Sequence, residues 1–132
     1  MEKLIIESTV NSPKIVLDPD KKTFEFSGES RPENVRKFFM PVLEWLEAYA
    51  KEFSDGGNKG DVDVLHCRFE FEYFNSTSAK YILDIFKLLS TLHENGPELK
   101  IEWIYEEDDE DMLEVGQEMS RMSKLPFEYV VS

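Results

Sequence analysis

The chain has 132 residues, of which 28 are acidic and 15 basic, so its formal net charge is −13. This charge repels nucleic acid and anionic lipid, and we expect neither nucleic acid nor a membrane as a partner. Hydrophobic residues make up 41% of the chain, which is enough for one folded domain over residues 1–132 with a single core.

Cysteine content and hydropathy narrow the class of protein further. The single cysteine, Cys67, excludes an intrachain disulfide and a cysteine-based zinc cluster. Met1-Glu2-Lys3 leads straight into an alternating pattern without a signal-peptide signature, and no apolar run approaches the length of a membrane span. We therefore expect a soluble cytoplasmic protein.

The first thirty residues predict antiparallel hairpins. Leu4–Thr9 has the pattern of a first strand, which Ser12-Pro13 ends, and Lys14–Leu17 has the pattern of a second. Asp18-Pro19-Asp20 has the composition of a turn, and Thr23–Ser27 then alternates between apolar and polar residues. Three short strands this close together favour antiparallel pairing.

A helical period follows. Ser30 and Glu33 have the spacing of a capping box around Pro32, so we expect a helix with Ser30 as its N-cap. Pro41 lies within this helix and is predicted to kink it or split it. A glycine-rich loop is expected at residues 55–60. The predicted buried stripe of the helix comprises Phe38, Val42, Trp45, Leu46 and Tyr49.

The next predicted strand, Val62–Phe74, alternates along its whole length. Its apolar face comprises Leu65, Cys67, Phe69, Phe71 and Tyr73. Its polar face comprises His66, Arg68, Glu70 and Glu72. A strand of a doubly wound parallel sheet is apolar on both faces, so this pattern predicts a sheet with one face partly open to solvent.

The last third of the chain alternates between helices and strands. A second helix is predicted from near Ser76 to the stop signal at residues 95–97, followed by a strand at Leu99–Tyr105. An acidic run leads into a third helix, and Phe127–Val131 is the last strand. The order of elements predicts an α/β fold, with α+β as the alternative: a mixed sheet of about five to six strands with about three helices mainly on one face.

No catalytic set is visible in the sequence. His66 falls on the polar face of its strand and His93 in the last turn of its helix, and neither has a nucleophile beside it. Cys67 lies on the opposite face from His66 and is expected to be a core residue. There is no phosphate-binding glycine loop, nucleophile elbow or zinc-protease motif. We therefore expect a protein that is not an enzyme and holds no cofactor.

The acidic run Glu106–Asp111 lacks the spacing of a calcium-binding loop. Its simplest interpretation is a solvated helix start in which the carboxylates complement the helix dipole. Two alternatives remain: a charged docking surface for a partner, and a divalent-metal site of an enzyme.

The segment Asn75–Ser78 supplies four capping residues where a single N-cap is needed. Three hydroxyls at a helix N-terminus can accept a phosphate, because the first N–H groups lack partners and the macrodipole favours negative charge. The phosphate could be attached, with Ser76 as acceptor, or bound. In the second case the segment is a small-anion or nucleotide-binding module with Arg31, Arg68 or Lys80 as counter-charges.

Four blocks of the sequence match a known pattern. They are Gly28-Glu29-Ser30-Arg31-Pro32-Glu33-Asn34, Phe39-Met40-Pro41-Val42-Leu43-Glu44-Trp45-Leu46, Tyr73-Phe74-Asn75-Ser76-Thr77-Ser78-Ala79-Lys80, and Trp103-Ile104-Tyr105 followed by Asp108-Asp109-Glu110-Asp111-Met112. In this order, and spanning nearly the whole chain, they resemble the SiaC family of bacterial regulatory phosphoproteins.

The resemblance implies a non-enzymatic partner-switching domain, loosely similar to anti-anti-sigma-factor (STAS-type) proteins. A Ser/Thr protein kinase would modify a hydroxyl after the long strand, and a PP2C-type phosphatase would reverse the modification. The unmodified form would bind and activate a diguanylate cyclase, raising cyclic-di-GMP and favouring biofilm growth. The threonine of the family falls on Ser76, which keeps the hydroxyl, and Thr77 is the reserve acceptor.

A small set of residues around this acceptor is expected to contribute to partner binding. Ser78 belongs to the set, although its main role is expected to be structural. The set comprises Asn75, Ser78, Lys80, Arg31, Glu33 and Asn34.

Overall fold

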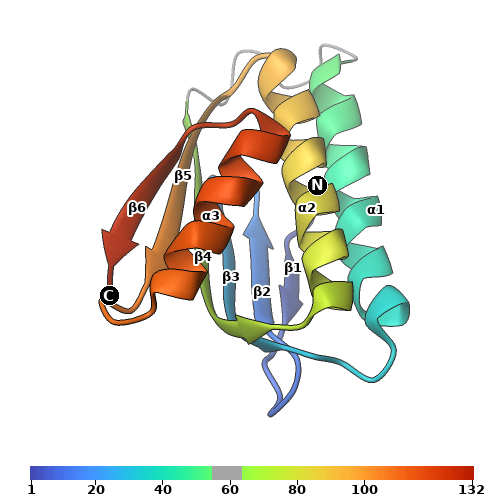
Figure 1. The fold of residues 1–132 in the computed structure, drawn as a ribbon. Coiled ribbons are helices and arrows are strands. Elements are labelled where there is room, and N and C mark those ends of the chain that lie inside the picture. Colours follow the sequence, from blue (N-terminus) through green and yellow to red (C-terminus); the bar gives the residue numbers. More distant parts are fainter. Residues whose placement is uncertain (55–63) are drawn as a thin grey trace.

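The computed structural model describes residues 1–54 and 64–132, which form one six-stranded sheet covered by three helices (Figure 1). The strands are β1 (Leu4–Ile6), β2 (Lys14–Asp18), β3 (Thr23–Ser30), β4 (Val64–Phe74), β5 (Glu98–Tyr105) and β6 (Phe127–Val131). The helices are α1 (Val35–Ser54), α2 (Ser76–Glu94) and α3 (Glu110–Ser123).

The sheet is mixed, and its strands follow one another in chain order. β1, β2 and β3 pair antiparallel, whereas β3, β4, β5 and β6 pair parallel. Each helix connects two neighbouring parallel strands in the same direction across the sheet, so connections of one hand place all three helices on one face (Figure 1). The predicted α/β architecture is confirmed.

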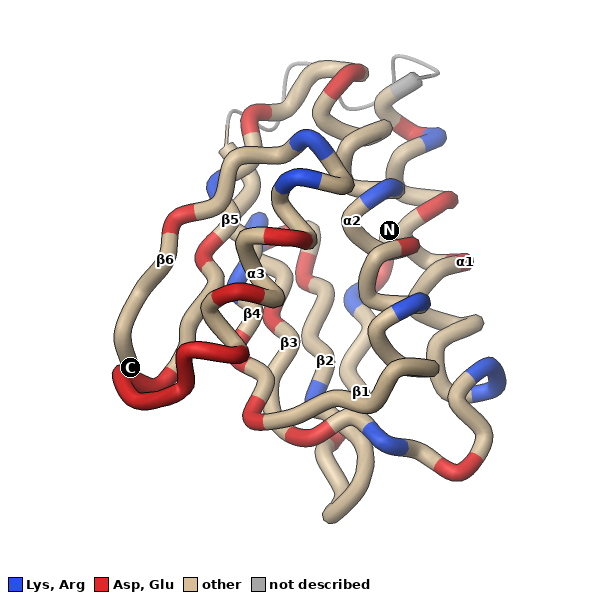
Figure 2. Tube along the Cα trace, in the orientation of Figure 1, with Lys and Arg blue, Asp and Glu red and all other residues tan. Residues whose placement is uncertain are grey.

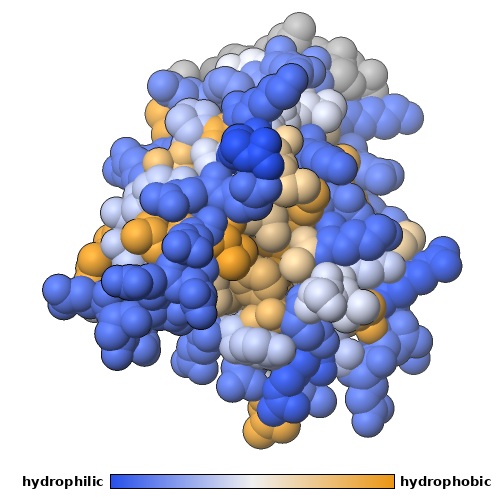
Figure 3. Space-filling view, in the orientation of Figure 1, coloured by the Kyte–Doolittle hydropathy of each residue, from blue (hydrophilic) through white to orange (hydrophobic). Residues whose placement is uncertain are grey.

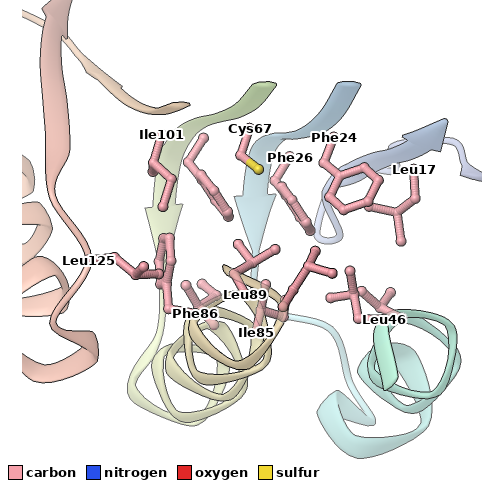
Figure 4. Packing of buried hydrophobic residues seen from close by; sticks show 14 of the residues in the cluster. Leu17, Phe24, Phe26, Leu46, Cys67, Ile85, Phe86, Leu89, Ile101 and Leu125 are labelled. Atoms are coloured by element: carbon pink, nitrogen blue, oxygen red, sulfur yellow. The ribbon is translucent and has the colours of Figure 1, made fainter. Parts of the chain in front are cut away.

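The hydrophobic core lies between the sheet and the helices (Figure 4). Phe26 and Phe69 stack face to face with ring centroids 4.4 Å apart, and Phe86 of α2 approaches Phe69 to 4.5 Å. Cys67 is fully buried among them, as predicted. Burial raises the pKa of its thiol, so the side chain stays protonated and serves as a small apolar residue.

Trp103 of β5 joins the sheet to α3. Its indole Nε1–H donates to the carbonyl oxygen of Met112 at 2.9 Å. Gly116, one turn further along α3, faces the same indole, and a Cβ atom built there would lie 2.5 Å from the ring. The absence of a side chain at Gly116 therefore sets how closely α3 approaches the sheet.

The start of α3 uses the acidic run as a helix cap. Asp109 Oδ1 accepts the backbone N–H of Met112 at 3.0 Å, and Glu110 and Asp111 occupy the first turn, where the dipole favours negative charge. The interpretation of the run as a helix start is confirmed.

None of the described helices lies on the second face of the sheet, which confirms the predicted open face (Figure 1). The alternation along β4 is as predicted from Leu65 to Glu72, but Tyr73 is 49% exposed rather than buried. Phe71 pairs with Gly28 and Tyr73 with Glu29, so β4 has one extra residue at this point. This β-bulge turns Tyr73 outward, which corrects the prediction.

One prediction about the start of α1 is wrong, and one of the two alternatives predicted for Pro41 does not occur. Ser30 does not cap the helix, because it is the last residue of β3 and is fully buried. The cap is Asn34, whose Oδ1 accepts the backbone N–H of Lys37 at 3.0 Å. Pro41 does not split α1, which continues to Ser54 because buried residues on both sides of the proline pack on the same core.

Strand ends differ from the predictions in smaller ways. β1 ends at Ile6 rather than Thr9, and β3 continues to Ser30 rather than ending at Ser27. The predicted loop at 55–60 and the first two residues of the predicted strand at 62–74 lie outside the described residues.

Candidate functional site

The predicted phosphoacceptor segment lies at the carboxyl edge of the sheet. β3 and β4 are parallel, so their carboxyl ends meet there, at Ser30 and Phe74. Asn75 follows β4 directly, and α2 begins at Ser76 (Figure 1). We call residues Asn75–Ser78 the acceptor segment.

Asn75 is the N-cap of α2. Its Oδ1 accepts the backbone N–H of Ser78 at 2.9 Å and the hydroxyl of Thr77 at 3.0 Å. Its own N–H donates to the carbonyl oxygen of Ser30 at 3.1 Å. Asn75 therefore both ends β4 and caps the start of α2.

Ser78 anchors the acceptor segment to the end of β3. Its side chain is fully buried, and its Oγ donates to the carbonyl oxygen of Ser30 at 2.9 Å. The Ser30 hydroxyl donates in turn to Ser78 Oγ, also at 2.9 Å. The hydroxyl of Ser78 is thus fully engaged inside the protein and does not lie on the surface.

Ser76 and Thr77 are exposed in the first turn of α2. Thr77 donates its hydroxyl to the cap, whereas the Ser76 hydroxyl has no hydrogen-bond partner within residues 1–54 and 64–132. Ser76 is the first helical residue, beside backbone N–H groups that lack intrahelical partners. A phosphate on Ser76 would meet the positive end of the helix dipole without displacing any bond seen here.

The cations expected near the segment are not gathered around it. Arg31 Nε pairs with Glu29 Oε2 at 3.1 Å. Arg68 projects from the open face and pairs with Glu102, with Nε and Oε1 3.8 Å apart. Arg68 precedes Phe74 by six residues along β4, so it lies about 20 Å from the end of the strand. Lys80 remains on α2, with its Nζ 4.8 Å from the centre of the Tyr81 ring.

The loop between β3 and α1 brings further predicted residues to the same edge. Arg31 donates its backbone N–H to the carbonyl oxygen of Asn11 at 2.9 Å, which ties this loop to the one between β1 and β2. Glu33 and Asn34 are exposed and, together with Phe38, line a shallow hollow of about 470 Å³. The predicted partner-binding residues on the surface therefore share one edge of the sheet.

Tyr73 is a surface residue of this edge that sequence reasoning placed in the core. The bulge exposes its ring immediately before the acceptor segment. The one local signal was Gly28 in the neighbouring strand, since a glycine inside a strand often marks a bulge. Gly28 has a φ of +104°, which other residues rarely adopt.

The surface on the helical side is mostly hydrophilic, with apolar residues gathered between α3 and α2 (Figure 3). Within the described ranges, no group of three or more His, Cys, Asp or Glu residues is arranged to hold a metal ion. None of the helices in those ranges has both the length and the apolar character needed to cross a membrane.

Proteins of similar sequence and fold are known. An uncharacterized protein of Pseudomonas aeruginosa (strain UCBPP-PA14) is 28% identical over 127 residues, covering 96% of this chain and 94% of that protein. The solved structure of SiaC of Pseudomonas aeruginosa has a TM-score of 0.79 at 24% identity and covers 100% of this chain and 98% of its own.

A second solved structure contains a partner. It is the crystal structure of the diguanylate cyclase SiaD in complex with its activator SiaC from Pseudomonas aeruginosa, matched with a TM-score of 0.82 at 26% identity over 98% of this chain and 99% of that chain. The family model described as "SiaC family regulatory phosphoprotein" matches residues 6–132. The chain therefore belongs to the SiaC family of regulatory phosphoproteins.

Proposed function

We propose that this chain is a non-enzymatic regulator whose binding to a partner protein is switched by reversible phosphorylation of Ser76, with Thr77 as the reserve acceptor. The observation that carries the proposal is the division of roles within the acceptor segment. Asn75 and Ser78 hold the segment in place through internal hydrogen bonds, whereas the exposed Ser76 hydroxyl has no hydrogen-bond partner among the described residues.

A phosphate at Ser76 changes the surface and leaves the fold in place. It adds nearly two negative charges and three strong acceptor oxygens at a helix N-terminus, where the dipole favours them. Lys80 lies four residues further along α2, on the same side of the helix, and can pair with the phosphate. The phosphate also makes the surface beside the exposed Tyr73 ring and the loop at Arg31 more negative, and a partner that binds this surface contacts the added charge.

The partners proposed here follow from family membership. A Ser/Thr protein kinase adds the phosphate, and a PP2C-type phosphatase removes it. The unmodified protein binds and activates a diguanylate cyclase, so that dephosphorylation raises cyclic-di-GMP and favours biofilm growth. Two observations support this proposal: the family model over residues 6–132, and the likeness to the SiaC chain solved with the cyclase SiaD.

The alternative of a small-anion or nucleotide-binding module has weaker support. Such a module needs counter-charges beside the start of α2. Arg31 is paired with Glu29, and Arg68 lies on the other face of the sheet, paired with Glu102. Of the three predicted counter-charges, Lys80 alone lies on α2.

The site of modification is tested by co-expressing the protein with its cognate kinase and locating the phosphate by mass spectrometry. The proposal predicts modification at Ser76 and its loss in Ser76→Ala. Modification that moves to Thr77 only in the Ser76→Ala variant fits the reserve role. A phosphate found only outside the acceptor segment would overturn the proposal.

A further inference from the structure

The open face of the sheet carries a hollow that the proposed switch does not use. It has a volume of about 530 Å³ and lies at the carboxyl ends of β3, β4 and β5. We call it the acidic hollow. The residues that line it include Lys14, Glu70, Glu72, Ile104, Glu106 and Asp109.

The floor of the acidic hollow is apolar. Trp103 faces the helices, so Ile104, the next residue of β5, projects to the open face. Ile104 is only 4% exposed, yet it is not part of the main core cluster. An apolar floor inside a polar rim is typical of a surface that buries a partner side chain.

The rim carries four carboxylates and one amine. Among the described residues, Glu70, Glu72 and Glu106 form no ion pair, whereas the one amine, Lys14, pairs with Glu7 at 4.0 Å. Figure 2 shows the acidic segment between β5 and α3 gathered at this corner of the molecule. The local field is therefore negative and uncompensated, within a protein of net charge −13.

We propose that the acidic hollow is a docking surface for a basic segment of a protein partner, with an arginine or lysine side chain entering the hollow. Charge complementarity selects this occupant. A second copy of the chain would bring a like-charged surface, and nucleic acid or anionic lipid would be repelled. A partner held here contacts the same edge of the sheet as the acceptor segment, but from its opposite face.

This surface goes beyond the proposed phosphorylation switch, because its charge is present whether or not Ser76 is modified. The test uses the full chain and a synthetic extended peptide with arginines at alternate positions, which therefore project to one side. The double variant Glu70→Gln/Glu72→Gln is compared with Glu44→Gln/Glu47→Gln, which makes the same charge change at exposed positions of α1. Calorimetry measures the affinity of each protein for the peptide.

The proposal predicts that the variant in the hollow binds the peptide about tenfold more weakly, while the α1 variant changes by less than about twofold. In the unaltered protein, amide resonances of Glu70 and Ile104 shift on adding the peptide. Equal losses in both variants, or shifts confined to the helical side, would show unspecific attraction and overturn the proposal. Spermidine binding as tightly as the peptide would also overturn it, in favour of a small polycation.

Discussion

Ser30 and Ser78 are joined by two hydrogen bonds although they lie 48 positions apart in the chain. Ser78 Oγ donates to the carbonyl oxygen of Ser30, and Ser30 Oγ donates to Ser78 Oγ, each at 2.9 Å. Both side chains are fully buried. This contact fixes the first turn of α2 to the end of β3 and so holds the exposed hydroxyls above it in a constant position.

Ser78→Ala is expected to lower the free energy of unfolding by about 1–3 kcal/mol, because the buried Ser30 hydroxyl loses its acceptor. Ser76→Ala removes the same group from the exposed surface of the same turn and is expected to change it by less than about 0.5 kcal/mol. Urea denaturation of both variants measures the difference. Similar values for the two would contradict a structural role of Ser78.

Gly116→Ala is expected to destabilise the protein by about 1–3 kcal/mol, since the added Cβ would lie 2.5 Å from the Trp103 ring. Helix propensity alone predicts the opposite sign, a gain of about 1 kcal/mol for glycine to alanine within a helix. Thermal unfolding measures which effect is larger. Gln117→Ala, at the exposed neighbouring position, is the control, and a stabilised Gly116→Ala protein would contradict the close contact.

Ionisation of Tyr49 is expected to lower the free energy of unfolding at alkaline pH. Its Oη is buried without a hydrogen-bond partner in the described parts of the chain. Burial, and then the nearby Glu52 and Cys67, raise the pKa of Tyr49 to about 12. Between about pH 10 and 12 the unfolded chain releases this proton while the folded protein keeps it, so up to about 3 kcal/mol of stability is lost as pH rises through this window.

Tyr49→Phe removes both the titration and the buried oxygen. The variant is expected to be at least as stable as the unaltered protein at neutral pH, and to lose less stability on raising the pH. Denaturation across this pH range is compared with Tyr73→Phe, the same change on a ring that is 49% exposed. If the free energy of unfolding falls equally with pH in the unaltered protein and in Tyr49→Phe, Tyr49 is not the group responsible.

Lys80 is expected to stabilise the phosphorylated form through its position one turn after Ser76. Phosphorylation of Ser76 should raise the free energy of unfolding by about 0.3–1 kcal/mol, and Lys80→Gln should reduce this gain. Lys87→Gln makes the same change further along α2 and should leave the gain intact. A gain that is insensitive to Lys80, or a loss on phosphorylation, would count against the pairing.

Local periodicity was enough to predict most of the fold. The alternation along β4 and the apolar stripe of α2 recur with the periods of a strand and a helix, so they are visible without any tertiary contact. The same alternation predicted the open face of the sheet, because every second residue of β4 is polar and does not need to be covered by a helix.

The predictions that were wrong depend on contacts between distant segments. Ser30 has the local spacing of a helix cap, but pairing with β4 and the bond to Ser78 hold it in the sheet. Tyr73 continues the apolar alternation, but the bulge opposite Gly28 turns it outward. Likewise, the surplus of hydroxyls in the acceptor segment was visible in the sequence, whereas the burial of Ser78 required the fold.

We propose that phosphorylation of Ser76 changes binding without changing the fold. The most direct test measures, by calorimetry, the affinity of a cognate diguanylate cyclase for the unmodified and the Ser76-phosphorylated protein, with thermal unfolding of the same samples. We expect binding at least about tenfold weaker after phosphorylation, a loss of about 1.4 kcal/mol or more, with the unfolding midpoint unchanged or slightly raised. Equal affinities, or a loss of binding that accompanies a loss of stability, would contradict it.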